Sequence, residues 1–324
     1  MSNLYSINNL DNLRITEGEY ELVNSFSRLI ATNREQAIDL LNDADLKFAT
    51  LFLLTDKIYE NNLIEFLSER NRVAIDIINE FQNSQCGRST DDITTLDYVQ
   101  IIQSTLEWVL KTGIDDYCSS CEYNEILDMS AIFLIKVYNN ISVLPIIAEL
   151  VFRRKCKGCY THELVWAFFE ARNVESLEYI ATGLLSNEKS DVDLAYKLLN
   201  FIPNIRNHKS PYNYALEWLV DNKKFIFFTG ETQHQRMEPI RCEICVRAKY
   251  LNKRINVSTG KIVEKLSKRD EEWLNSFDNS DYEERRLLAD YSHYLYKKGL
   301  IWWEIWHSYP IDKQVKIAKI GGLV

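Results

Sequence analysis

The sequence predicts an all-α protein, because glycine and proline are scarce and apolar residues recur with helical spacing. Only 10 glycines and 5 prolines occur in 324 residues, well below the usual shares of roughly 7% and 5%. Both residues interrupt regular structure, so their scarcity indicates long helices joined by short turns. We expect more than about 60% helix, arranged as a right-handed type of α-solenoid of stacked antiparallel helix pairs with a helical C-terminal cap.

The first predicted region is helical and covers residues 1–83. From Glu19 onward, apolar side chains such as Val23 and Phe26 recur at steps of three and four residues, which is the period of an amphipathic helix. Asn33 is a candidate N-cap for the next helix. Residues 1–16 lack this pattern and are expected to form a loose arm. Residues 84–95 cluster turn residues without periodicity, and they predict a linker.

The second predicted region, residues 96–222, consists of successive helices with short connections. The predicted helices are 96–111, 123–139, 143–155, 162–172, 174–186, 191–201 and 211–222. Two helix pairs within this region begin 31 residues apart and have the same order of elements. Each pair leaves an apolar face that the next pair can cover, which is the packing principle of α-solenoids.

Two short segments of this region resemble the HEAT-type repeat family. The segment 144–150, which contains Pro145, is similar to the first helix of such a repeat, and 190–195 looks like the start of the second. The family commonly has an arginine where this chain has Asp193, which puts the usual ladder of Asp–Arg contacts between repeats in doubt. The resemblance covers about residues 96–220 and implies a scaffold rather than a chemistry.

The last predicted region, residues 223–324, no longer shows the regular succession of helices. The aromatic stretch 223–230 ends in glycine and predicts a strand or packed loop that closes the repeats. Helix is expected over 239–251 and 268–307, with a turn or short hairpin over 252–264 between them. These elements predict a C-terminal cap, because the last repeat of a solenoid needs an atypical unit over its apolar face.

Charge and composition exclude several classes of protein. The net charge of −9 and the pI of about 5.3 repel a phosphate backbone or an anionic membrane, so we expect no nucleic-acid binding at physiological salt. The sequence begins without a secretory leader pattern, and no window approaches the roughly 18 apolar residues of a membrane span. Seven cysteines are expected to be reduced thiols. We therefore expect a cytoplasmic protein.

Six of the seven cysteines form Cys-x-x-Cys pairs, at 118/121, 156/159 and 242/245. Random placement would give about 0.13 such pairs. If helices 123–139 and 143–155 form an antiparallel hairpin, the first two pairs meet at its open end. The resulting zinc hypothesis has four cysteine ligands and a spare histidine: Cys118, Cys121, Cys156, Cys159 and His162. The alternative is that the thiols act as small packing residues without metal.

The third pair, Cys242 and Cys245, is expected in the first turns of a helix. A thioredoxin-like redox role would need a βαβ context that the sequence lacks, so buried packing is the favoured role. The sequence contains no glycine-rich phosphate loop, no Gly-x-Ser-x-Gly elbow and no HExxH motif. Catalysis therefore stays undecided, and the absence of such motifs favours a protein that is not an enzyme.

The C-terminal segment is rich in aromatic residues. Trp302, Trp306 and Tyr309 are spaced i, i+4 and i+7, so they would share one helix face that could anchor a partner or pack in the cap. The leading hypothesis is a non-catalytic helical-repeat scaffold or adaptor that binds another protein or a second copy of itself. The alternatives are a HEAT-like nucleic-acid-binding or nucleobase-processing protein, and a zinc- or thiol-dependent enzyme at Cys156, Cys159 and His162.

Overall fold

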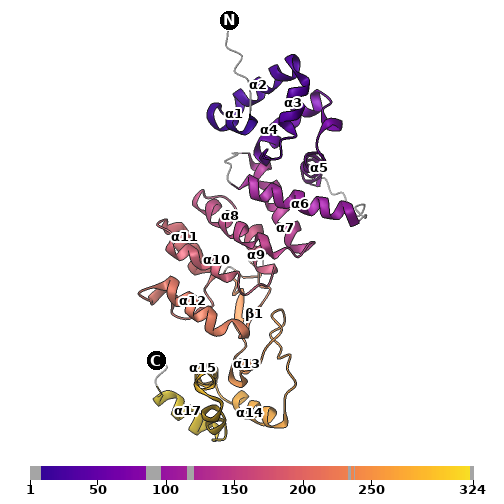
Figure 1. Ribbon diagram of the computed structural model, residues 1–324. Helices are drawn as coiled ribbons and strands as arrows, with labels where there is room; N and C mark the ends of the chain where they lie inside the picture. Colours follow the sequence, from indigo (N-terminus) through magenta and orange to yellow (C-terminus); the bar gives the residue numbers. More distant parts are fainter. Residues whose placement is uncertain (1–8, 85–95, 115–119, 233–234, 237, 322–324) are drawn as a thin grey trace. The chain divides into compact units, whose positions relative to one another are not determined.

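The computed structural model describes residues 9–84, 96–114, 120–232, 235–236 and 238–321 (Figure 1). Helices account for 71% of the structure, so the predicted all-α class and the expected helix content are confirmed. The chain forms two compact units, which we describe separately. The first unit comprises residues 1–151 and 163–167, and the second comprises 152–162 and 168–324. No helix in the described ranges is long and apolar enough to cross a membrane.

The first unit is built from seven helices, and α8 and α9 contribute residues to both units. The bounds are α1 Leu10–Glu17, α2 Glu19–Thr32, α3 Arg34–Leu41, α4 Phe48–Glu60, α5 Glu69–Ser84, α6 Leu96–Gly113, α7 Cys121–Lys136, α8 Leu144–Cys156 and α9 His162–Glu170, with 3-10 turns η1 Ile64–Phe66 and η2 Ile141–Val143. The predicted linker 84–95 lies outside the described residues except for Ser84, which ends α5.

Helix α1 corrects the expectation of a loose arm over residues 1–16. The Asn9 side chain caps this helix by accepting a hydrogen bond from the backbone N–H of Asn12 at 2.8 Å. The buried Asp11 carboxylate accepts from the backbone N–H of Lys47 at 3.1 Å and from Thr50 Oγ1 at 2.5 Å. These bonds fix α1 against α4, because an unpaired buried carboxylate would be costly.

An aromatic cluster joins α4, α6 and α7 within the first unit. Tyr123 is 1% exposed, its ring stacks on Phe48 at 5.4 Å between centroids, and it meets Phe52 edge-on at 5.2 Å. Its hydroxyl donates to the carbonyl of Gly113 at 3.0 Å. Offset stacked and edge-on rings are the preferred aromatic geometries. Tyr123 is therefore both a large core residue and a satisfied polar group.

The second unit contains the remaining helices and a two-stranded sheet. The helices are α10 Leu177–Ala181, α11 Lys189–Leu198, α12 Pro211–Asn222, α13 Val246–Leu251, α14 Lys268–Asp278, α15 Tyr282–Lys298, α16 Leu300–His307 and α17 Ile311–Ile320, with 3-10 turns η3 Thr182–Leu185, η4 Ile205–Asn207 and η5 Lys223–Phe225. Strands β1 Ile226–Phe228 and β2 Cys242–Ile244 pair antiparallel. A bridge between Ile255 and Ile262 confirms the short hairpin predicted there.

The helix predicted over 174–186 is broken in the structure into α10 and the 3-10 turn η3. Gly183 lies in this turn, and a Cβ atom at this position would lie 2.4 Å from the Phe152 ring. The tighter 3-10 turn and the missing side chain together let the Phe152 ring pack directly on the backbone of the turn. The periodicity of the sequence contains no sign of this close approach.

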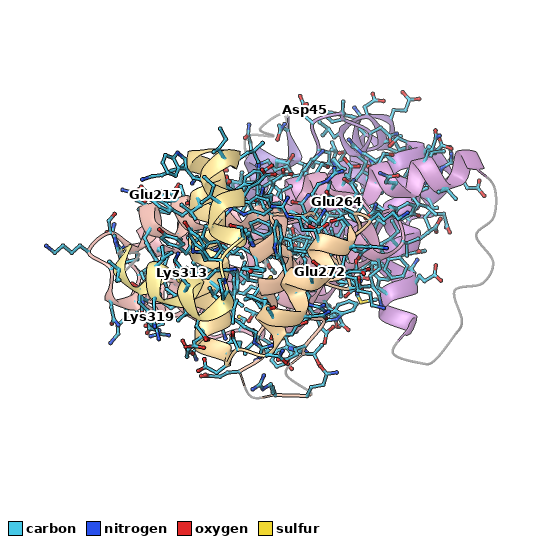
Figure 2. The ribbon with its side chains drawn as sticks, turned by 90° about the horizontal axis from the view of Figure 1, so that it is seen from below. Asp45, Glu217, Glu264, Glu272, Lys313 and Lys319 are labelled. Carbon is cyan, nitrogen blue, oxygen red and sulfur yellow. The ribbon has the colours of Figure 1, made fainter. Side chains whose placement is uncertain are left out.

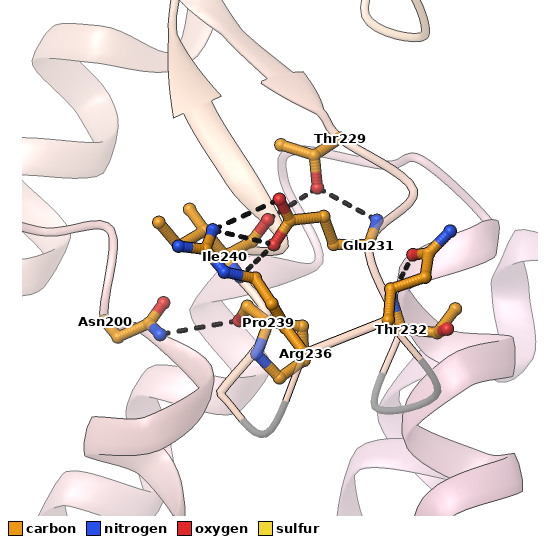
Figure 3. Close-up of polar contacts among 8 residues, drawn as sticks. Asn200, Thr229, Glu231, Thr232, Arg236, Pro239 and Ile240 are labelled. Atoms are coloured by element: carbon orange, nitrogen blue, oxygen red, sulfur yellow. Dashed lines mark hydrogen bonds and ion pairs between the residues drawn. The ribbon is translucent and has the colours of Figure 1, made fainter.

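Polar contacts hold the described residues on either side of the turn between β1 and β2 (Figure 3). The Thr229 hydroxyl donates to the Ile240 carbonyl at 2.5 Å, and Glu231 Oε2 accepts from the Ile240 N–H at 2.9 Å. Asn200, just after α11, donates to the Pro239 carbonyl at 3.4 Å. The contacts join Pro239 to the segment after α11 and hold Ile240 in place beside the sheet.

Candidate functional site

The structure describes three of the four cysteines proposed as zinc ligands. Cys118 lies outside the described residues. Cys121 is exposed at the start of α7, directly after the N-cap residue Ser120. Cys156 and Cys159 are both exposed and belong to the second unit, with Gly158 between them at a φ of +69°. The glycine thus supports the tight turn that the sequence predicts for this pair.

The Cys156 thiol has polar partners of its own. Its sulfur lies 3.0 Å from Asp191 Oδ1, to which it donates, and 3.3 Å from Ser190 Oγ. The hydrogen bond to the carboxylate raises the pKa of Cys156 above its ordinary value, because the bond requires the thiol proton. The thiol also ends α8, where the helix dipole disfavours a negative charge. Cys156 is therefore poorly suited to act as a nucleophile.

No group of three or more His, Cys, Asp or Glu side chains in the described part of the chain is arranged to hold a metal ion. His162 is buried at the start of α9. The zinc hypothesis for Cys118, Cys121, Cys156 and Cys159 stays a prediction, because Cys118 is not among the residues described.

Elemental analysis tests the zinc hypothesis directly. A four-cysteine site would retain about one zinc per chain, and a chelator would lower the melting temperature because metal binding is coupled to folding. The Cys156→Ser variant would lower both the zinc content and the melting temperature. Less than about a tenth of an equivalent of zinc in purified protein would contradict the hypothesis.

Cys242 and Cys245 do not lie in the first turns of a helix, as their spacing after Pro239 predicted. Cys242 is the first residue of β2 and is fully buried, while Cys245 is the partly buried N-cap of α13. Burial raises the pKa of Cys242 well above its ordinary value. The packing role is confirmed for Cys242, whose thiol stays protonated near neutral pH.

The three C-terminal aromatics do not form one exposed face. Trp306 is 3% exposed and packs against Tyr250 and Tyr291, with ring centroids 6.0 and 5.5 Å away. Tyr309 is half-buried, whereas Trp302 is 65% exposed. The i, i+4 spacing was a poor guide here because α16 packs through Trp303, Trp306 and His307, which turns Trp302 towards solvent.

Helix α16 instead presents a different apolar surface. Leu300, Ile301, Trp302 and Ile305 are 58, 72, 65 and 44% exposed, and we call these four residues the α16 surface. Five of the first six residues of α16 are apolar, with Glu304 the exception. The periodicity of the sequence therefore could not separate the buried side of this helix from the exposed side, and the sequence alone did not predict the α16 surface.

The C-terminal segment that contains α16 is locally basic. Residues 291–324 contain five lysines against two acids, although the whole chain carries a net charge of −9. Lys313 and Lys319 lie on α17 (Figure 2). Lys313 lies 3.6 Å from the centre of the Tyr309 ring, and Lys298 lies 4.4 Å from that of Tyr294. Cation–π contacts of this kind leave the ammonium charge in place.

The start of α16 lacks a side-chain cap. Gly299, with a φ of +152°, ends α15 and directly precedes α16. A glycine has no side chain to accept from the first N–H groups of the following helix, and these groups have no partner within the helix. The α16 surface thus begins at a helix end that no side chain caps.

A serine–histidine pair lies beneath this surface. Ser292 Oγ donates to the Tyr250 carbonyl at 2.5 Å, accepts from Trp303 Nε1 at 2.8 Å, and lies 3.0 Å from His307 Nε2. Because the hydroxyl proton is already used, Nε2 must carry a proton and donate to Ser292. Burial lowers the pKa of His307 to about 3, so the imidazole is neutral.

The pair cannot serve a substrate in this conformation. Ser292 is fully buried and His307 is 2% exposed, and Trp273 stacks on the imidazole with ring centroids 4.3 Å apart. The two residues are 15 positions apart, and no motif in the sequence indicated that they would meet. Their arrangement is that of a buried polar network that orders the core.

Comparisons with known proteins leave the function to be inferred from these side chains, since no protein-family model, no curated protein and no solved structure matches the chain.

Proposed function

We propose that this protein is a non-catalytic helical scaffold or adaptor and that a partner protein binds its α16 surface. The observation that carries the proposal is the exposure of Leu300, Ile301, Trp302 and Ile305 on one short helix. Adjacent large apolar side chains that remain in water are typical of interaction sites, and tryptophan is enriched among residues that dominate binding energy.

The charges around the surface favour a partner with an apolar patch and an acidic rim. Lys298 and Lys313 lie over the Tyr294 and Tyr309 rings, and complementary charge would steer and orient such a partner. A symmetric dimer through this surface would bring the basic ends of two copies together, so a different protein is favoured over a second copy.

The two alternative functions have less support. A nucleic-acid-binding role would have to overcome the net charge of −9, and the α16 surface offers apolar side chains rather than a basic groove. A thiol enzyme at Cys156 would need a depressed pKa, whereas the contact with Asp191 raises it.

We extend the proposal to the architecture of residues 96–222, for which HEAT-like stacked helix pairs remain our hypothesis. Short connections support this hypothesis. Where the structure describes the connections in this region, brief turns join successive elements, and α12 follows η4 after only three residues, 208–210. Such an arrangement would suit a scaffold, because stacked helices offer extended binding surfaces.

Charge substitutions on the α16 surface test the proposal. We expect Ile301→Asp and Trp302→Glu to lose a partner that the unchanged protein retains from an extract of its native host, because a buried carboxylate costs more than the apolar contact contributes. Once that partner is purified, its affinity should fall at least about tenfold. The measurements are quantitative mass spectrometry of the retained proteins and titration calorimetry.

Val263→Glu is the matched control, since Val263 is 58% exposed in the same unit but lies outside α16. The same set of retained proteins with all variants would contradict the proposal. Sedimentation equilibrium of the purified chain covers self-association: a dimer that Trp302→Glu dissociates would place a second copy on the surface instead of a different protein.

A further inference from the structure

The second unit contains a pocket that the proposed interaction does not use. Its volume is about 600 Å³, within the range of about 300 to 1,000 Å³ that is common for small-molecule sites. Its walls come from the segment after α11, from α12, from the β1–β2 hairpin, from α13, from the hairpin at 255–262 and from the first part of α15. Ile240 of the loop in Figure 3 and Asn200, which donates to that loop at Pro239, both belong to the wall.

Aromatic rings from separate elements line this pocket. Phe201 and Trp218 lie with ring centroids 5.9 Å apart, and Phe227 and Tyr282 form other parts of the lining. Gly260 packs on Phe227 so closely that a Cβ atom would come within 3.0 Å of its ring, and its φ of +67° also favours glycine. Planar aromatic faces of this kind stack on flat rings of a ligand.

Two of the cationic residues of the lining are already neutralised. Lys249 Nζ donates to Asp290 Oδ1 at 2.5 Å and to Asn222 Oδ1 at 2.6 Å. Arg247 pairs with Asp278 at 3.3 Å. These contacts account for Lys249, Arg247 and the lining carboxylate Asp290, so they leave little charge for a ligand.

Arg285 and Arg286 are different, because neither forms an ion pair with an acid in the described residues. The Nε atom of Arg285 is buried and has no hydrogen-bond acceptor there, and a buried donor without an acceptor is costly. Arg286 lies 5.8 Å from the centre of the Tyr282 ring and also lines an adjoining hollow. Glu243 is a lining carboxylate without an ion pair among these residues.

We propose that this pocket binds a small molecule of the mononucleotide class, which combines a planar ring with a phosphate. The two guanidinium groups of Arg285 and Arg286 match the charge of a phosphate monoester and can hold it through paired hydrogen bonds. Trp218 and Phe201 offer faces for the ring. Glu243 can accept hydrogen bonds from a ring amino group or a sugar hydroxyl.

Titration calorimetry with AMP, GMP, CMP and UMP tests the proposal. At least one nucleotide should bind with a Kd below about 1 mM, while its nucleoside and inorganic phosphate should each bind at least about tenfold more weakly, since each lacks half of the contacts. The double variant Arg285→Gln, Arg286→Gln should weaken nucleotide binding at least about tenfold. The corresponding double lysine variant should lose less, because it keeps the charge.

Arg254→Gln is the matched control, because Arg254 is exposed in the same unit and does not line the pocket. Circular dichroism establishes that each variant is folded, and Trp218→Leu replaces the arginine variants if they are not. Failure of all four nucleotides to bind below about 1 mM would overturn the proposal, as would unchanged affinity in the double glutamine variant or an equal loss in Arg254→Gln. If inorganic phosphate binds as tightly as the nucleotide, the ring has no role and the proposal also fails.

The inference is independent of the proposed interaction. Trp302→Glu removes an exposed residue of α16 that is not part of the pocket lining, so it should bind the nucleotide with unchanged affinity. The nucleotide site can therefore be confirmed even if the α16 surface binds no partner, and partner binding at the α16 surface can be confirmed even if no nucleotide binds.

Discussion

Replacing Tyr123 with alanine is expected to lower the free energy of unfolding of the first unit by about 3 to 5 kcal/mol. The change removes a ring that is 1% exposed and that contacts both Phe48 and Phe52. It also deletes the donor to the Gly113 carbonyl. Urea unfolding followed by circular dichroism measures the effect.

Two further tyrosine variants separate the causes. Tyr123→Phe keeps the ring and should cost only about 1 kcal/mol, the net contribution of a typical hydrogen bond. Tyr20→Ala is the control, because Tyr20 is 82% exposed on α2 and its loss should change stability by less than about 0.5 kcal/mol. A small effect of Tyr123→Ala would mean that the aromatic cluster does not carry the packing assigned to it.

Acid is expected to destabilise the second unit because His307 is held neutral. Burial lowers the pKa of His307 from 6.5 to about 3. Between these two values, the imidazole binds a proton in the unfolded chain but not in the folded chain. The stability contributed by His307 is therefore complete above its unfolded pKa and is lost as the pH falls towards 3. The loss from this residue between pH 7 and pH 5 should be about 2 kcal/mol.

The measurement is the unfolding free energy at several pH values, for the unchanged protein and for His307→Gln. The variant should be less stable at pH 7 and should show a flatter decline between pH 7 and pH 5, since the titrating group is gone. His208→Gln is the control, because His208 is exposed. His293 should add to the acid sensitivity in the same direction, as burial lowers its pKa to about 4. An equal slope in the protein and in His307→Gln would contradict the assignment.

The helices that the sequence predicted well are those with clear boundary residues and a clean apolar stripe. Helix α12 runs from Pro211 to Asn222, the predicted range, because proline favours the first helical turn and its missing N–H costs nothing there. Helix α1 was not predicted, although Asn9 is a good N-cap residue, because eight residues are too few to show a clear helical periodicity.

The candidate surface could be predicted only in part. The density of aromatics directed attention to α16, but which of Trp302 and Trp306 is buried depends on the packing of α16 against α15 and against Tyr250 of α13, which is a tertiary property. Arg285, Trp218 and Glu243 are far apart in the sequence and meet only because several elements surround one pocket. No short motif encodes such a meeting, so neither the pocket nor the Ser292–His307 pair could have been found before the fold.

The uncapped start of α16 has a consequence for how binding could be detected. Because Gly299 provides no side chain to accept from the first turn, the amides of Leu300, Ile301 and Trp302 should exchange their hydrogens with solvent quickly in the isolated protein. A partner that covers the α16 surface and places a carboxylate at this helix end would supply the missing acceptor. The free chain would then have an incomplete helix that its partner completes, and slowed exchange of these three amides would report occupancy without any label.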